Sequence, residues 1–433
     1  MANKKTNLNS AWLAIFVLAL MPVLLWWQAP ALLPRWSSLT ITLANLGQLA
    51  ALVGTALFAV SLILGARLKF LEKYFHGLDK IYENHSRLGQ IALILLLAHP
   101  LFLLPKYTSG DWQYAAVWLL PSANWAQNWG WFSLALMIGL LILTLYLRPK
   151  YNLWKLTHKF LGLAFFLAVL HILLIRSDTT IYPLLKIYLL ALSAVALGAF
   201  AYRALFGRGL VRKHLYRVAK VTKISDTVVE ITLSPEGQPL RFQPGQFVFI
   251  SFEDINVGRE SHPFSISSSN HDRDLTITVK QLGDYTAKIT NLTVGAAAKV
   301  EGPFGYFSYH NAENFNQIWI AGGIGITPFV SMAQSLPNDG SYKIDLFYCA
   351  KTAAEAVYLQ QLTGLNPSLK VIAYCSDQKT SRLDAKTIAE LAGTLSGKDI
   401  FICGPAPMMR DLRRQLIAEG INQKFIHIEE FSF

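Results

Sequence analysis

The sequence predicts a multi-domain protein in which a six-helix transmembrane bundle (all-α) precedes an antiparallel β-barrel domain and an α/β domain of Rossmann-like type. Three observations predict this order. Six long apolar runs lie before residue 208. Short alternating strands with Pro and Gly turns follow, and after residue 312 strands alternate with helical stretches. We therefore expect domains at residues 1–207, 208–312 and 313–433.

Each apolar run is near the length of about 20 residues that a helix needs to cross a bilayer. The chain is 53% hydrophobic with a mean hydropathy of +0.34, and the excess lies in the first half. A cleaved signal peptide is the alternative for residues 1–31, but the second span follows so soon that an anchored helix is favoured. The predicted spans are 11–27, 39–64, 88–104, 129–147, 154–175 and 182–205.

Basic residues gather on one side of these spans. The connections on the other side hold only Arg35, Lys106 and Arg176. By the positive-inside rule, both termini and everything after residue 208 lie in the cytoplasm, with the bundle in the cell membrane. The net charge of +12 is explained by this topology, and no arginine-rich segment indicates nucleic acid. Three cysteines without CxxC spacing indicate neither a zinc site nor a disulfide framework.

Two alternate spans each carry a pair of histidines. The pairs His85 with His99 and His158 with His171 are separated along their helices by about 21 Å and about 20 Å. Imidazole is a common axial ligand of haem iron. We therefore predict two b-type haems, one held by His85 and His158 and one by His99 and His171. A lone histidine bonded to a backbone carbonyl is the alternative for any one of them.

The spacing of the second pair is imperfect. Thirteen residues leave His171 about 140° from His158 on an ideal helix, whereas His99 lies within about 40° of His85. We therefore expect either a bend or local rewinding near Gly162, or haem edges approached from different sides.

Two stretches of the strand-rich region combine an aromatic face, hydroxyls, a cation and a Gly turn. Together they predict a site for a flavin ring and its pyrophosphate, and a polar hairpin is the alternative for either stretch alone. The first comprises His262, Pro263, Phe264, Ser265, Ser267 and Ser268, and the second comprises Lys280, Gly283, Tyr285 and Thr286.

The α/β region carries a glycine-rich turn directly after a strand, although it lacks the GxGxxG spacing. Glycine allows the backbone to approach a pyrophosphate at a helix N-terminus. A second strand ends in small residues that would form one side of a nicotinamide site. These predicted residues are Gly322, Gly323, Gly325, Thr327 and Pro328, then Cys403, Gly404 and Pro405. Ser376, Lys379 and Arg382 are candidates for a ribose 2′-phosphate, with a solvated loop as the alternative.

With these motifs the chain resembles the NADPH oxidase and ferric reductase superfamily over nearly its whole length. His85, His99, His158 and His171 match the haem ligands, His262 to Ser265 the HPF(S/T) flavin motif, and Lys280 with Gly283 to Thr286 the flavin-phosphate segment, where Arg is often found at Lys280. Gly322 to Pro328 and Cys403 to Pro405 match the nicotinamide-nucleotide motifs. Phe433 matches a C-terminal aromatic expected to cover the flavin, with a solvated terminal residue as its alternative.

The resemblance implies transfer of electrons from cytosolic NADPH or NADH, through FAD and two haems, to external O2, which gives superoxide. The rivals are a ferric or cupric reductase using the same path, and a membrane cytochrome that serves a protein partner. No EF-hand sequence is found, and the compact layout implies no obligatory cytosolic activator. Arg176 is a candidate for guiding oxygen or pairing a haem propionate, with an interfacial snorkelling arginine as the alternative. Phe165 and Phe166 are candidates for shortening the gap between the haems, although core packing is favoured for either.

Overall fold

The computed structural model describes residues 7–28, 35–108, 114, 120–147, 149, 151–378 and 382–430. The chain divides into two compact units, Met1–Val211 and Arg212–Phe433.

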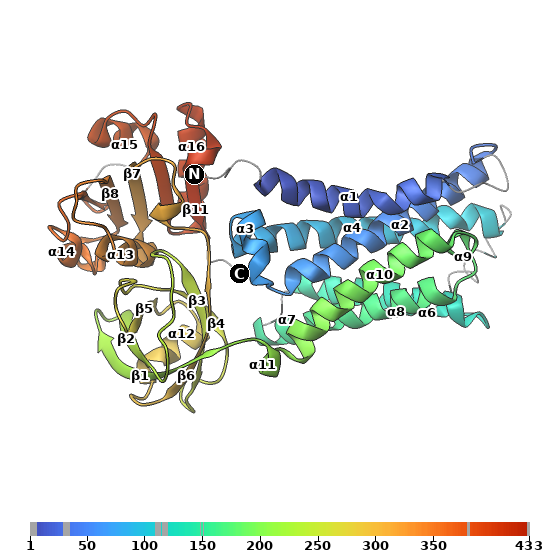
Figure 1. Ribbon diagram of the computed structural model, residues 1–433, viewed down its shortest axis with the longest axis horizontal. Helices are drawn as coiled ribbons and strands as arrows, with labels where there is room; N and C mark the ends of the chain where they lie inside the picture. Colours follow the sequence, from blue (N-terminus) through green and yellow to red (C-terminus); the bar gives the residue numbers. More distant parts are fainter. Residues whose placement is uncertain are drawn as a thin grey trace. The chain divides into compact units, whose positions relative to one another are not determined.

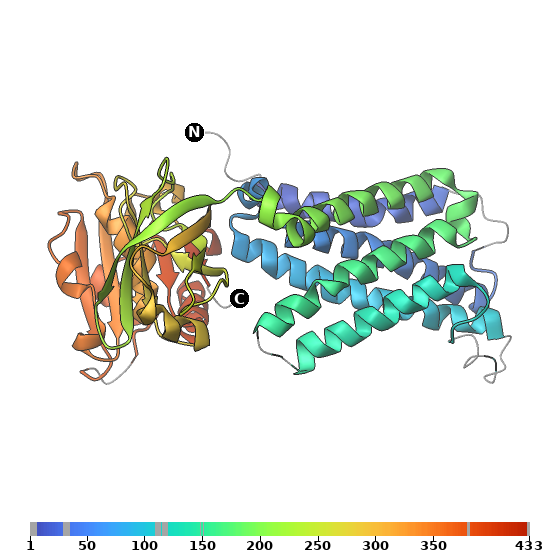
Figure 2. The ribbon, with the colours of Figure 1, turned by 90° about the horizontal axis from the view of Figure 1, so that it is seen from below.

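Unit 1 is helical, and its long helices lie lengthwise beside one another (Figure 2). These long helices are α1 (Asn7–Gln28), α2 (Leu39–Gly65), α4 (Leu78–Thr108), α6 (Trp125–Ile142), α8 (Phe160–Leu174) and α10 (Pro183–Phe200). Shorter helical elements are η2 (Lys69–Leu71), α3 (Glu72–Phe75), η3 (Leu143–Leu147), α7 (Tyr151–His158), α9 (Asp178–Ile181), η4 (Ala201–Leu205) and α11 (Gly207–Leu210).

Five helices among the described residues are long and apolar enough to cross a membrane by length and composition: Ser10–Gln28, Leu39–Gly65, Leu78–Thr108, Leu153–Leu174 and Pro183–Leu205. The fourth predicted span is also helical, as α6 followed by η3, but it is not among the five. Gln127 and Asn128, in the first turn of α6, lower the mean hydropathy of that helix. Large apolar side chains such as Leu13 and Ile94 are more than 60% exposed, which is typical of a surface that faces lipid.

Helix α2 packs closely on α4 because α2 presents small residues. Ala56 and Ala59 are almost fully buried. A Cβ added at Gly54 would lie 3.0 Å from the Leu96 side chain of α4, so glycine at this position lets Leu96 pack against the backbone of α2. This contact fixes the helix that carries His85 and His99 against α2.

Unit 2 begins with a six-stranded antiparallel sheet in the order β4-β3-β6-β1-β2-β5 (Figure 1). One antiparallel bridge, between Ile266 directly after β4 and Ile277 of β5, joins the two edge strands. The apolar side chains of these strands form one core. The strands are β1 (His214–Lys223), β2 (Val228–Pro235), β3 (Phe247–Glu253), β4 (His262–Ser265), β5 (Leu275–Lys280) and β6 (Ala297–Phe304). The helices α12 (Asp284–Lys288) and η5 (Ile289–Asn291) follow β5, and η6 (Tyr309–Asn311) follows β6.

A five-stranded parallel sheet completes unit 2, in the order β11-β10-β7-β8-β9. One core lies on the face covered by α13 and α14, and another on the face covered by α15 and α16 (Figure 1). The strands are β7 (Asn316–Gly322), β8 (Lys343–Ala350), β9 (Leu369–Cys375), β10 (Asp399–Cys403) and β11 (Ile426–Glu429). The helices are η7 (Gly323–Ile326), α13 (Thr327–Gln334), η8 (Ala353–Glu355), α14 (Leu359–Leu362), α15 (Ala385–Ala392), α16 (Ala406–Ala418) and η9 (Gln423–Phe425).

Candidate functional site

The structure brings the four histidines of unit 1 together in two pairs. The ring centroids of His85 and His158 are 5.9 Å apart, with their planes at 71°. His99 and His171 lie near enough for an electrostatic interaction between their rings. These are the pairs predicted from the sequence, because two spans separated by one intervening span run parallel.

Three of the four imidazoles are oriented by a backbone carbonyl of a neighbouring helix. The distance from Nδ1 to the carbonyl oxygen is 2.7 Å for His85 with Ser61, 2.9 Å for His99 with Gly47, and 2.7 Å for His171 with Ala126. A carbonyl oxygen only accepts, so Nδ1 carries the hydrogen in each ring. The Nε2 atom of each ring therefore keeps its lone pair, which is the arrangement found in histidines that bind metal.

Glycines lie beside the same rings. A Cβ added at Gly65 would lie 3.2 Å from Cε1 of His85, and one added at Gly130 would lie 2.9 Å from Nδ1 of His171. Both distances are tighter than an ordinary side-chain contact, so a larger residue would push the ring aside. Glycine at these two positions leaves room for an imidazole ring to pack against the helix backbone.

The helix that carries His158 and His171 is interrupted between them. Helix α7 ends at His158 and α8 begins at Phe160. Hydrogen bonds across three residues, from Lys159 N to Leu156 O and from Gly162 N to Lys159 O, wind this junction more tightly than an α-helix. The expected local rewinding near Gly162 is present and begins three residues earlier, so the angular mismatch of an ideal helix does not apply.

The spacing of His85 and His158 fits a haem. Each axial nitrogen lies about 2 Å from a bound metal, so two axial imidazoles have centroids about 6 Å apart, which agrees with the 5.9 Å between His85 and His158. Among the described residues, no group of three or more His, Cys, Asp or Glu is placed to hold a metal ion. A haem iron needs only two ligands from the protein, because the porphyrin supplies the other four nitrogens.

In the antiparallel sheet, His262 and Tyr285 stack with centroids 3.9 Å apart and planes at 26°. Nε2 of His262 lies 3.0 Å from a carboxylate oxygen of Glu260. Burial, and next the charge of Glu260, raise the pKa of Tyr285, so its hydroxyl is neutral at physiological pH. Phe264 packs into the core at 8% exposure, and Pro263 between them is half-buried. Tyr285 is also buried in this core, at 9% exposure, so His262 is the partly exposed ring of the stacked pair.

Buried hydroxyls after β4 join the two sheets of unit 2 in what we call the polar seam, which comprises Ser267, Ser268, Ser269, Thr278, Ser331, Ser335 and Tyr358. The hydroxyl of Ser267 lies 3.0 Å from that of Thr278, which lies 2.6 Å from the Tyr358 hydroxyl. The Ser331 hydroxyl donates to the carbonyl of Ser268 at 2.7 Å. Ser265, just before the seam, is 8% exposed. Sequence reasoning found Ser267 and Ser268 but missed Tyr358 and Thr278.

The predicted flavin-phosphate segment forms a tight turn. The Thr286 hydroxyl accepts from the backbone N–H groups of Leu282 at 2.9 Å and Gly283 at 3.0 Å. Gly283 is the N-cap of α12, and Lys280 ends β5 at the same turn. The Thr286 hydroxyl thus occupies the backbone amides of Leu282 and Gly283 in the turn that was predicted to hold the pyrophosphate.

In the parallel sheet, the predicted nucleotide residues meet where the strand order reverses. The chain runs from β7 through β8 to β9 and then returns to β10 on the other side of β7. Ala321 of β7 pairs with Cys403 of β10 at the carboxyl ends of the strands. Ligands of open α/β sheets bind outside these ends, at such a switch point. Gly322 and Gly404, the next residue of each chain segment, therefore flank this position.

The glycines at the switch point differ in role. A Cβ added at Gly325 would lie 2.4 Å from the carbonyl oxygen of Cys403, and one added at Gly404 would lie 3.0 Å from Cα of Gly322. These glycines allow the two strand ends to touch. Gly323 instead has a φ of +55° and open space around its Cβ position. A ligand that approaches the backbone therefore meets Gly323 first.

Residues around the switch point complete the predicted set. Thr327 and Pro328 form the first turn of α13, and the Thr327 hydroxyl donates to the Ile324 carbonyl at 3.1 Å. Pro405 caps the N-terminus of α16. The Cys403 thiol is buried in the core beneath α13, and burial followed by the charge of Glu429 raises its pKa well above the usual range.

Ser376 and Arg382 are both exposed after β9, and the Ser376 N–H donates to the Ala350 carbonyl at 3.0 Å. Both residues follow β9, which is parallel to β7 and ends at the same edge of the sheet as Gly322. Lys379 and Phe433 lie outside the described residues.

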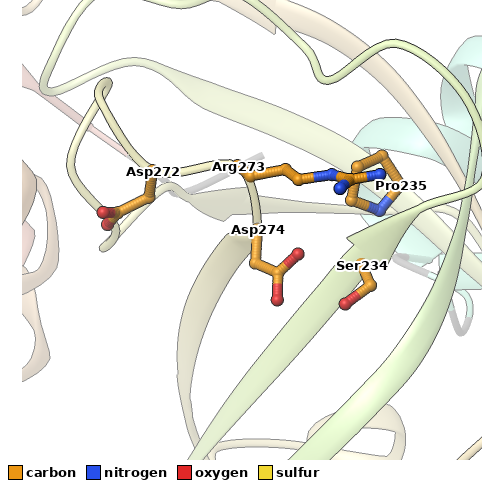
Figure 3. A pocket seen from close by; sticks show the side chains of 5 residues that line it. All are labelled: Ser234, Pro235, Asp272, Arg273 and Asp274. Atoms are coloured by element: carbon orange, nitrogen blue, oxygen red, sulfur yellow. The ribbon is translucent and has the colours of Figure 1, made fainter.

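A hollow in the antiparallel domain is lined by Ser234, Pro235, Asp272, Arg273 and Asp274 (Figure 3). None of the predicted binding residues lines it. Its charged wall also lacks the aromatic surface typical of a cofactor site, so it is not part of the candidate site.

Three family models match consecutive parts of the chain. Residues 50–169 match the ferric reductase like transmembrane component, residues 214–325 match an FAD-binding domain, and residues 319–414 match an oxidoreductase NAD-binding domain. The chain has the NADPH oxidase and ferric reductase architecture. With its apolar helices, this ferric-reductase-type chain is a membrane oxidoreductase that has FAD-binding and NAD-binding domains.

Curated relatives of this ferric-reductase-type chain are also oxidoreductases. The ferredoxin reductase component of 3-ketosteroid-9-alpha-monooxygenase from Mycolicibacterium smegmatis is 28% identical over 223 residues, 49% of this chain and 63% of the relative. A flavohemoprotein from Rhizobium meliloti is 26% identical over 48% of this chain and 57% of the relative. The chain thus spans about three fifths of the length of these relatives. Among solved structures, the flavohem-like FAD/NAD binding domain of a nitric oxide dioxygenase from Vibrio cholerae is 25% identical, with a TM-score of 0.45, over 50% of this chain and 98% of that one.

Proposed function

We propose that this chain is a six-span NAD(P)H oxidase of the cell membrane whose termini and unit 2 are cytoplasmic. In this proposal FAD converts the two-electron chemistry of NAD(P)H into one-electron steps, and two b-type haems carry single electrons to external O2, which gives superoxide. The observation that carries the proposal is the pair of histidine couples, three of whose members have Nδ1 fixed by a carbonyl and Nε2 left for a metal. The matches to an FAD-binding and an NAD-binding domain support the first part of the proposed electron path.

The residues of the chain have separate tasks in this proposal. His85 with His158 and His99 with His171 hold the two haems. His262, held by its stack on the buried Tyr285, offers a flat surface for the flavin, and the buried seam hydroxyls of Ser267 and Ser268 lie just beyond β4. Gly323 leaves room for the pyrophosphate of NAD(P)H.

Further residues take finer roles in the proposal. Lys280 supplies the charge for the flavin phosphates, and Gly283 with Thr286 shapes the turn beside it, since the Thr286 hydroxyl accepts from the amides of Leu282 and Gly283. Ser376 and Arg382 are placed for a ribose 2′-phosphate, although the choice between NADPH and NADH is left open. The six strands form a closed barrel, for which the bridge between Ile266 and Ile277 is the support. No cytosolic activator is required.

A metalloreductase is the second candidate, because residues 50–169 match a ferric reductase like component. The same electron path would then deliver to ferric or cupric ions. A membrane cytochrome that serves a protein partner remains the third. The purified chain, reconstituted in lipid with FAD and haem, distinguishes them. Reduction of cytochrome c that superoxide dismutase abolishes supports the oxidase, dismutase-insensitive reduction of chelated iron supports the reductase, and negligible turnover with both supports the cytochrome.

The histidine assignment has its own test. His99→Leu or His171→Leu should remove the absorbance of one haem, while reduction of the flavin by NAD(P)H continues. Retention of two haems per chain by either variant would refute the ligand assignment, and a wild-type chain without a b-type spectrum would refute the proposed function.

A further inference from the structure

Four side chains of unit 2 form a continuous chain of hydrogen bonds that ends on a carboxylate. The hydroxyl of Ser267 lies 3.0 Å from that of Thr278, which lies 2.6 Å from the Tyr358 hydroxyl. Tyr358 in turn donates to a carboxylate oxygen of Glu230 at 2.7 Å. The three hydroxyl residues are at most 6% exposed, whereas Glu230 is half-buried. The chain therefore leads from a buried hydroxyl to a group within reach of solvent.

The hydrogens of this chain all point toward Glu230. An ionised carboxylate only accepts, so the single hydroxyl hydrogen of Tyr358 lies on its bond to Glu230. The Tyr358 oxygen must then accept from Thr278, and the Thr278 oxygen must accept from Ser267. Burial raises the pKa of Tyr358, so its hydroxyl keeps its hydrogen. The Ser267 oxygen is left with lone pairs that can accept a proton.

The other branch of the polar seam ends on backbone carbonyls. Ser331 donates to the Ser268 carbonyl at 2.7 Å, and Ser335 donates to the Ser331 carbonyl at 2.8 Å. A backbone carbonyl satisfies a hydroxyl but takes up no proton at physiological pH, whereas a carboxylate does both. Packing of the two sheets therefore explains the Ser331 branch, but it does not require the Ser267 branch to end on Glu230.

The buried end of the chain follows the proposed flavin stretch closely in the sequence. Ser267 comes two residues after β4, which is the stretch His262–Ser265. The Ser267 N–H donates to the Thr276 carbonyl of β5 at 2.8 Å. Glu230 of β2 lies directly opposite Thr278 of β5, so their side chains share one face of the sheet. The chain thus crosses from the end of β4 over β5 to β2.

Oxidation of one NAD(P)H gives NAD(P)+, two electrons and one proton. In the proposed function, on which this inference rests, the electrons leave through the haems, so one proton per NAD(P)H has to leave the flavin site. We propose that the hydroxyls of Ser267, Thr278 and Tyr358 carry this proton to Glu230, which passes it to cytoplasmic water. The Ser267 oxygen accepts one proton as each hydroxyl hands its own hydrogen to the next oxygen. The Glu230 carboxylate ends with one proton, and no electron moves along the chain.

The test follows the proton as well as the electrons. The full-length chain, loaded with FAD and haem, is mixed without oxygen in weak buffer with one equivalent of NADH or NADPH. Absorbance reports the reduction of flavin and then of haem, and a pH-indicator dye reports proton release. We expect wild type to release one proton per dinucleotide together with haem reduction. Glu230→Gln should release it at least about tenfold more slowly, because an amide oxygen still accepts from Tyr358 but takes up no proton.

The first half of the reaction separates this inference from the proposed function. Reduction of the flavin in Glu230→Gln should stay within about twofold of wild type, since hydride transfer precedes proton release. Proton release from Glu230→Gln at the wild-type rate would overturn the inference and leave the seam with a packing role alone. A wild-type chain that binds no FAD, or whose flavin is not reduced by either dinucleotide, would instead refute the proposed function.

Substitutions in the middle of the chain distinguish a relay from packing. Thr278→Val removes the hydroxyl and should slow proton release as Glu230→Gln does, whereas Thr278→Ser keeps the hydroxyl and should release the proton at nearly the wild-type rate. Glu253→Gln is the matched control, because Glu253 also bonds a side chain of the same sheet, Lys299, but takes no part in the chain. Equal rates of proton release in Thr278→Val and Thr278→Ser would contradict the relay.

Discussion

Phe58 and Phe165 meet edge to face, with ring centroids 5.0 Å apart and planes at 67°. Phe165 is fully buried and Phe58 is 7% exposed. Phe58 lies in α2, between Gly47 and Ser61, whose carbonyls contact His99 and His85. Phe165 lies in α8, and in the sequence it falls between His158 and His171. The neighbouring Phe166 is 45% exposed. Of the two phenylalanines considered from the sequence, only Phe165 thus fills the interior between the pairs.

Phe165→Ala should lower the free energy of unfolding by about 3–5 kcal/mol, because a large ring is removed from a filled interior. Thermal unfolding in detergent measures this change. Phe166→Ala is the matched control, and we expect it to change stability by less than about 0.5 kcal/mol because its ring is largely exposed. Equal stability of the two variants would show that Phe165 is not a packing residue.

Gly130→Ala should displace the ring of His171, because the added Cβ would lie 2.9 Å from Nδ1 and disturb its bond to the Ala126 carbonyl. We expect the haem content to fall from two per chain to one, as read from the ratio of Soret absorbance to protein. Gly139→Ala, in the same helix, is the control because nothing lies within 4 Å of its Cβ position. A full complement of haem in Gly130→Ala would contradict the assignment of His171.

Gly323→Ala should weaken NAD(P)H binding by more than its backbone cost explains. At φ +55° an alanine costs about 1 kcal/mol or somewhat more. Gly340→Ala carries a similar backbone cost, since Gly340 has a φ of +73° and open space around it. Gly340 comes just before β8, however, and the switch point lies at the other, carboxyl end of the strands. Comparison of the dissociation constants for NAD(P)H isolates the contribution of the site. If both variants bind equally well, Gly323 does not contact the dinucleotide.

Asp384 should make the stability of α15 depend on pH. Its carboxylate accepts a hydrogen bond from the backbone N–H of Thr387 at 2.8 Å, and this bond holds the pKa of Asp384 below its ordinary value of 3.8. A lowered folded pKa contributes stability that is present above pH 3.8 and is lost as the pH falls through the folded value. Asp384→Ala should therefore cost about 1 kcal/mol at pH 7, with a smaller difference in acid.

Asp384→Asn is the control for the pH dependence, because an amide oxygen also caps a helix but does not titrate in this range. Denaturant unfolding at pH 7 and pH 3 measures both variants. A difference between Asp384→Ala and wild type that stays constant between these pH values would contradict the expectation.

The sequence was most informative where the apolar pattern was regular. The region predicted to contain short alternating strands holds β1 to β6, among them β2 from Val228 and β5 from Leu275. Strand β1 departs from strict alternation because it has a bulge between Val218 and Lys220. Helix α4 begins at Leu78, ten residues before the predicted span, since its first turns are polar and a helix continues beyond the apolar run.

The residues that orient the site were harder to predict than the motif residues. Backbone carbonyls bind three histidines, and any residue type supplies a carbonyl, so no sequence signal marks Ser61, Gly47 or Ala126. Tyr358 lies 80 residues from its partner Thr278, and only the packing of one sheet on the other brings them together. Glycines give a partial signal, because Gly65 and Gly130 stand out in apolar helices.

The polar seam has a consequence for the thermal behaviour of unit 2. Ser331 donates to the Ser268 carbonyl, and the Thr278 hydroxyl lies 2.6 Å from that of Tyr358, all of them buried. Melting either sheet alone would strand these hydroxyls in an apolar interior, so heat should disrupt both sheets in one cooperative transition. A dinucleotide bound to the parallel sheet would then raise the melting temperature of the antiparallel sheet as well.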